Sequence, residues 1–152
     1  MPNARAVVRT AIAIWLMALA LTALPARADP NDIAAASRSV VRVLIFPVDE
    51  SETVPISHGT GVVVAPGVIL TNNHVINEDE FDQPVRYVIV PAEGSETYPA
   101  DIIDRSPRND LALLKTRDKA RMASAGFFIG PVADGLDVFA IGYPGGVEVA
   151  QG

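Results

Sequence analysis

The 152-residue sequence lacks cysteine, has fewer basic than acidic residues, and contains no apolar run long enough for a membrane span. Without cysteine no disulfide can stabilise the fold, so its stability must come from burial, a partner or a longer chain. The 12 basic residues against 18 acidic ones argue against nucleic acid as a partner, because phosphates attract basic surfaces. With 49% hydrophobic and 20% charged residues, the composition is that of a globular protein and excludes a disordered one.

Residues 1–28 have the three parts of a secretory signal peptide. Arg5 and Arg9 supply the positive start, residues 11–24 form a run that is apolar except for one threonine, and Ala26-Arg27-Ala28 is a small-x-small cleavage site. The run of 14 residues is shorter than the roughly 18–20 needed to cross a bilayer, which favours cleavage and export over a stable membrane anchor. We therefore expect a secreted or periplasmic protein of 124 residues, with nine basic and 18 acidic residues and a net charge of −9.

Beyond this leader, the sequence predicts a short helix and then an all-β domain. Asn31 and Asp32 can cap a helix that ends at Ser37, inside a lead-in segment of residues 29–38. Runs typical of short strands follow, separated by turns such as Pro66-Gly67. These runs are residues 40–46, 57–65, 68–70, 84–90, 98–104 and 111–115, and residues 136–142 are a seventh candidate. Their close spacing indicates a β-barrel or a β-sandwich.

Two histidines and one aspartate are candidates for a functional site. His74 follows Thr71-Asn72-Asn73 at the end of an apolar strand, a rim position from which catalytic groups are often presented. Asp110 stands at the mouth of the last of the six strands, where desolvation would strengthen its attraction for an imidazolium. His58 lies in a polar stretch and is interpreted as structural. Taken singly, His74 as a structural histidine and Asp110 as a turn aspartate are the simpler interpretations.

The sequence predicts neither a metal site nor a cofactor site. His58 and His74 are 16 residues apart, form no His-x-x-x-His pair, and have their nearby acids in a different loop. That loop, Glu78-Asp79-Glu80 with Asp82, lacks the alternating oxygen ligands around a glycine turn that calcium requires, so it is interpreted as solvated surface.

Four segments taken together resemble, in order, the first two-thirds of a trypsin-like serine protease of the bacterial HtrA (Deg) type. The segments are Gly59-Thr60-Gly61-Val62-Val63-Val64, Val68-Ile69-Leu70-Thr71-Asn72-Asn73-His74-Val75, Asn109-Asp110-Leu111-Ala112-Leu113-Leu114-Lys115 and Val138-Phe139-Ala140-Ile141-Gly142-Tyr143-Pro144-Gly145-Gly146. The resemblance covers the chain from about residue 40 to its end.

The resemblance implies an all-β, chymotrypsin-like fold, with a six-stranded first β-barrel over residues 39–126 and the opening strand of an incomplete second barrel in residues 127–152. It also implies that His74 is the general base of a serine endopeptidase and that Asp110 orients it, 36 residues further on. We therefore predict that His74 Nδ1 lies within hydrogen-bond reach of an Asp110 oxygen. The substrate would be a polypeptide, and an HtrA-like protein would assemble as a homo-oligomer.

The nucleophile of that family is missing from the sequence. A Gly-x-Ser-Gly-Gly segment should carry it, but none of the seven serines precedes a glycine pair, and Gly145-Gly146 follows Pro144. The oxyanion hole beside the nucleophile is missing with it. Two interpretations remain: the reading frame continues beyond Gly152 and supplies the serine, or the protein is an inactive secreted β-barrel that binds a partner without hydrolysis.

Overall fold

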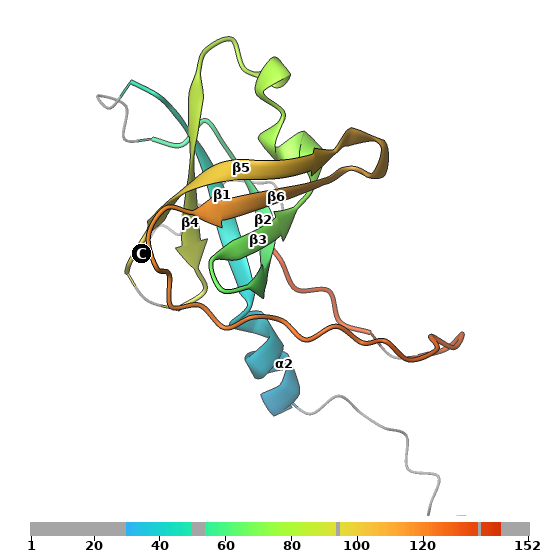
Figure 1. Cartoon of the computed structure of the whole chain (residues 1–152). Coiled ribbons are helices and arrows are strands. Elements are labelled where there is room, and N and C mark those ends of the chain that lie inside the picture. Colours follow the sequence, from blue (N-terminus) through green and yellow to red (C-terminus); the bar gives the residue numbers. More distant parts are fainter. Residues whose placement is uncertain (1–29, 50–53, 94, 137, 144–152) are drawn as a thin grey trace, which may run out of the picture.

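The computed structural model describes residues 30–49, 54–93, 95–136 and 138–143, and its centre is a closed six-stranded antiparallel barrel (Figure 1). The strand order around the barrel is β1-β2-β3-β6-β5-β4, and β4 pairs with β1 to close it. The strands are β1 Val40–Pro47, β2 Ser57–Ala65, β3 Val68–Thr71, β4 Val85–Pro91, β5 Tyr98–Ser106 and β6 Leu111–Thr116. The six predicted strands and the all-β class are thus confirmed, with strand ends that differ by at most two residues.

Short helices precede the barrel and connect its strands. The helix α2, Pro30–Ser37, ends at Ser37 as predicted but begins at Pro30, so Asn31 and Asp32, which were expected to cap it, are helical residues of its first turn. Three 3₁₀ turns lie in the connections: η1 Asn73–Ile76, η2 Glu78–Glu80 and η3 Pro107–Asn109. The expected leader, residues 1–28, lies outside the described residues.

The barrel core is built from apolar side chains on the inward face of each strand, where inward and outward positions alternate along the strand. On β1, Val41, Val43 and Ile45 are fully buried, and the same inward face is continued by one or two residues from every other strand. The core residues are Val41, Val43, Ile45, Val63, Ile69, Ile76, Tyr87, Ile89, Tyr98, Ala100, Ala112 and Leu114. Register shifts in β2 between Val63 and Ala65 and in β5 between Ile102 and Asp104 supply the local bending that closure requires.

The pairing of β3 with β6 decides where the candidate site forms. Thr71, the last residue of β3, lies opposite Ala112, the second residue of β6. Because the two strands are antiparallel, the chain that leaves β3 and the chain that enters β6 lie at the same end of the barrel. At the other end of β3, Pro66-Gly67 forms the predicted tight turn, with Gly67 at φ 69°.

The strand expected over residues 136–142 is not formed. Among the described residues of this range none belongs to a strand, and the side chains of Leu136, Val138 and Phe139 are all more than half exposed. A strand needs a neighbour for its main-chain hydrogen bonds, and a closed barrel offers no free edge. The segment after β6 runs along the barrel, where Ala125 N–H donates to the Val63 carbonyl (2.7 Å), then extends away and returns to the barrel at Tyr143 (Figure 1).

Replacing Gly61 with alanine should destabilise the barrel. A Cβ at Gly61 would stand 2.5 Å from Cγ2 of Ile69 and 3.1 Å from methyl groups of Val41 and Val43, three residues of the core. Overpacking of this kind typically costs about 1–3 kcal/mol of unfolding free energy. Urea unfolding of Gly61→Ala measures it. Gly126→Ala, where nothing lies within 4 Å, is the matched control and should unfold like the unchanged chain. Equal midpoints for the two variants would contradict the packing described here.

Candidate active site

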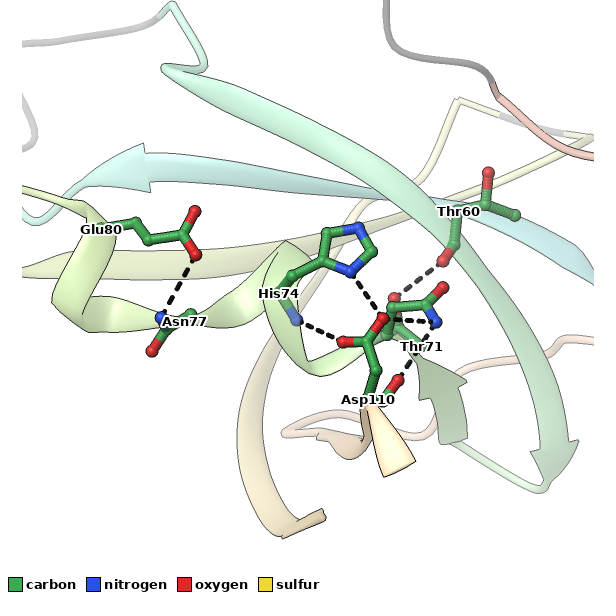
Figure 2. A network of polar contacts seen from close by, with 7 residues as sticks. Thr60, Thr71, His74, Asn77, Glu80 and Asp110 are labelled. Atoms are coloured by element: carbon green, nitrogen blue, oxygen red, sulfur yellow. Dashed lines mark hydrogen bonds and ion pairs between the residues drawn. The ribbon is translucent and has the colours of Figure 1, made fainter. Parts of the chain in front are cut away.

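The fold brings His74 and Asp110 together at one end of the barrel. His74 is the second residue of η1, directly after β3, and Asp110 follows η3 as the last residue before β6. Since β3 and β6 are paired, the two short turns lie side by side, and their side chains face each other (Figure 2). Residues that are 36 positions apart in the sequence are thereby placed in contact.

Two hydrogen bonds connect the Asp110 carboxylate to His74. Oδ2 lies 2.7 Å from the ring nitrogen Nδ1, and Oδ1 accepts from the His74 main-chain N–H at 2.9 Å. The predicted contact between Nδ1 and an Asp110 oxygen is confirmed. The carboxylate thus contacts both the main chain and the ring of His74. The two bonds together fix the orientation of the carboxylate relative to the ring. In the described part of the chain, Nε2 has no hydrogen-bond partner, and 65% of the His74 side chain is exposed.

The carboxylate is held in its charged form by these donors. The His74 N–H, followed by the His74 ring, lowers the pKa of Asp110 below its ordinary value. Because 45% of the Asp110 side chain is exposed, water screens the attraction, and the geometry of the hydrogen bonds contributes more than the charge. This arrangement favours the tautomer with the proton on Nδ1 and leaves Nε2 able to accept a proton from a group brought to it.

The conformation of Asp110 itself is unusual. It has φ 52° and ψ 45°, and it is the one non-glycine residue with positive φ in the described part of the chain. Its N–H donates to the Pro107 carbonyl at 3.1 Å, which closes the η3 turn. Aspartate tolerates this left-handed conformation better than most residues, so the turn can direct the carboxylate back towards η1.

A buried tyrosine anchors the turn that carries His74. The Tyr87 hydroxyl of β4 lies 3.1 Å from the Ile76 carbonyl at the end of η1 and 3.1 Å from a Glu78 carboxylate oxygen. Burial, together with the charge of Glu78, raises the pKa of Tyr87, so the phenol keeps the proton that it donates. Ile76 is fully buried in the core beneath it. The η1 turn is therefore fixed to the barrel at its carboxyl end.

Thr60 connects the start of the same turn to the end of the described chain. Its carbonyl accepts from the Thr71 hydroxyl at 2.7 Å, just before the site (Figure 2), and its own hydroxyl oxygen accepts from Tyr143 N–H at 2.7 Å. The guanidinium of Arg42 lies over the Tyr143 ring, 4.6 Å from its centre. Sequence reasoning placed Thr60 in a motif but did not assign it a contact.

The remaining predicted features can also be located. His58 lies on β2 opposite Leu44 and takes no part in the polar network of His74 and Asp110. Within the described ranges, no three histidine, cysteine, aspartate or glutamate side chains gather as metal ligands would. None of the helices described in the chain has both the length and the apolar character for crossing a membrane.

Asn72 is the functional candidate that sequence reasoning missed. Its amide nitrogen donates to the Asp110 carbonyl at 3.1 Å and to Oδ2 at 3.2 Å. The available signal was its place two residues before His74, at the end of a strand. That position does not reveal where the side chain points, because an asparagine before a helical turn ordinarily caps the turn.

Comparison with known proteins agrees with this geometry. The family model of the trypsin-like peptidase domain matches residues 59–151. A probable periplasmic serine endoprotease, DegP-like, from Bartonella henselae is 36% identical over 74 residues, which are 48% of this chain and 14% of that protein. Human serine protease HTRA3 is 30% identical over 95 residues, 60% of this chain and 20% of that protein. The crystal structure of a serine endoprotease from Yersinia pestis superposes with a TM-score of 0.52 and 26% identity, covering 65% of this chain and 32% of that chain.

The closed six-stranded antiparallel barrel matches the chymotrypsin-like fold. The chain belongs to the trypsin-like peptidase domain family, and its relatives are of the HtrA/DegP type. The aligned segments span 14% to 32% of the lengths of the relatives named above.

Replacing Asp110 with asparagine should remove a pH-dependent part of the stability. A carboxylate whose pKa is lowered on folding stabilises the folded state above its unfolded pKa, about 3.9, and this contribution is lost as the pH falls through the lower, folded value. Asp110→Asn should therefore be less stable than the unchanged chain near neutral pH, and the difference should shrink in acid. Urea unfolding at about pH 7 and about pH 3 measures both differences.

Asp82→Asn is the matched control for loss of a negative charge, because the Asp82 carboxylate is exposed and lies outside this network. A difference between Asp110→Asn and the unchanged chain that is as large at acid pH as at neutral pH would contradict the bonds described here.

Proposed function

We propose that this chain carries two catalytic residues of an exported serine endopeptidase: His74 as the general base and Asp110 as the carboxylate that orients it. The observation that carries the proposal is the double contact of one carboxylate, with Nδ1 at 2.7 Å and with the main-chain N–H of the same histidine at 2.9 Å. Membership of the trypsin-like peptidase family and the names of the HtrA/DegP relatives support it. The substrate would be a polypeptide, and assembly into homo-oligomers is part of the same expectation.

In this mechanism, Nε2 of His74 takes the proton of a serine hydroxyl as the serine oxygen bonds to the scissile carbonyl carbon. The imidazolium that forms is stabilised by Asp110, and it then gives its proton to the leaving amine as the peptide C–N bond breaks. Water, activated by the same imidazole, hydrolyses the resulting acyl-enzyme. The exposed position of Nε2 at the rim of the barrel suits this role, because the serine must reach it from outside the described residues.

The second candidate is an inactive secreted β-barrel that binds a partner without hydrolysis. The observation that favours it is the sequence itself, because its 152 residues contain no Gly-x-Ser-Gly-Gly segment. The two candidates differ in one group only, the nucleophile. The two candidates are separated by whether the reading frame beyond codon 152 encodes the serine and whether the product reacts with a serine-directed probe.

A serine-directed fluorophosphonate probe tests the choice. The 152-residue chain should not be labelled, whereas the product of the whole natural reading frame should be labelled at a serine within Gly-x-Ser-Gly-Gly and should cleave casein. In that product, His74→Ala and Asp110→Asn should each lower kcat/KM by about 10³-fold or more. The first variant removes the general base of the serine, and the second removes the carboxylate that orients this base. His58→Ala is the matched control and should retain activity. A reading frame that stops at codon 152, with no labelled product, would favour the binding module.

Export can be tested separately from hydrolysis. The leader predicts that a bacterial cell expressing the protein releases a mature form that begins at Asp29, immediately after Ala26-Arg27-Ala28. Mass spectrometry of the periplasmic and culture fractions identifies that terminus. Ala28→Arg, which places a large charged residue at the cleavage position, should leave the precursor uncleaved. An unprocessed chain recovered from the cytoplasm in both cases would contradict export.

A further inference from the structure

Asn72 stands where an asparagine would ordinarily cap a helical turn, but it does not do so. It is the residue before η1, with an extended backbone at φ −78° and ψ 145°, and its side chain makes no capping bond. An asparagine oxygen in this position usually accepts from an N–H of the following turn. Here the amide donates to Asp110 instead, so the side chain gives up the local bond for a contact with a residue 38 positions away.

The two bonds of Asn72 reach both parts of Asp110 that must be fixed. One goes to the main-chain carbonyl at 3.1 Å and the other to Oδ2 at 3.2 Å, and a primary amide has the two hydrogens that this requires. Oδ2 is also the oxygen that contacts His74 Nδ1. The first bond acts on a peptide in the left-handed conformation, and the second limits rotation of the carboxylate about its own axis.

We propose that Asn72 is a positioning residue that holds Asp110 in the orientation needed to select the Nδ1–H tautomer of His74. The importance of this role in catalysis rests on the proposed function. The need for such a residue follows from exposure: 65% of the His74 side chain and 45% of the Asp110 side chain face solvent, where water competes for the same lone pairs. With the amide in place, Oδ2 receives two donors from one side of the barrel end, and the carboxylate cannot turn towards water without breaking both.

NMR of the ¹⁵N-labelled 152-residue chain tests the proposal, because the nitrogen shifts of a neutral imidazole report whether Nδ1 or Nε2 carries the proton. His58 and His74 are the two histidines of the sequence, so a His58→Gln variant assigns the signals. Asn72→Ser is the main variant: serine is favoured before a helical turn but is too short to replace the bonds to Asp110. Asn72→Asp is the second variant, because it keeps the shape of the side chain and replaces the donor with an acceptor.

The matched control is Asn77→Ser, which removes an asparagine amide from the same loop. That amide donates to Glu80 at 3.3 Å and does not contact Asp110. We expect the Nδ1–H form of His74 to dominate in the unchanged chain and in Asn77→Ser. In Asn72→Ser and Asn72→Asp the ratio of the Nδ1–H to the Nε2–H form should fall about two- to tenfold, the range that loss of one ordinary hydrogen bond gives.

The ratio distinguishes positioning from simple stabilisation. If an Asn72 variant is folded and keeps the ratio of the unchanged chain, the proposal is overturned, even where its unfolding midpoint has fallen. If the unchanged chain itself shows no excess of the Nδ1–H form, the contact between His74 and Asp110 fails, and the proposed function fails with it. If the Nδ1–H form dominates in the unchanged chain and the Asn72 variants keep the same tautomer ratio, the role of Asn72 is overturned but the proposed function is not.

Discussion

The antiparallel pairing of β3 with β6 is the constraint on which the candidate site depends. Thr71 lies opposite Ala112, so His74 and Asp110 must lie close together, although β4 and β5 are inserted between them in the sequence. The core fixes this register, because a slip by one residue would turn Ile69 towards solvent and expose a fully buried side chain. Burial in the barrel therefore fixes the register that brings two exposed polar residues together.

The order of the site comes from main-chain and neighbouring polar groups more than from burial. The carboxylate of Asp110 contacts the main-chain N–H and the imidazole of His74 and accepts from the side-chain amide of Asn72. Tyr87 fixes the far end of the same turn to β4. An exposed ion pair between two mobile side chains would be weak and variable in geometry. Here the pair is short and directed because each partner is held by a turn whose ends are anchored in the sheet.

Most of the barrel could be predicted from the sequence, since β-branched runs between turn residues determine strands locally. Residues 136–142 have the same local character, but whether a run becomes a strand depends on an available edge, which local sequence does not encode. The pairing of His74 with Asp110 came from the resemblance of four ordered segments, because neither residue alone differs from a structural histidine or a turn aspartate. The roles of Asn72 and Thr60 were out of reach, since they follow from side-chain directions that only the assembled barrel defines.

The histidine and the carboxylate are assembled by barrel residues alone. The direct bonds to the Asp110 residue come from residues 72–74 and 107, Tyr87 anchors the turn that carries His74, and the sheet beneath them is closed. The geometry of His74 and Asp110 is therefore accounted for by bonds within the described residues. Since both proposed functions share this geometry, the nucleophilic serine is the group that separates a hydrolase from a binding module.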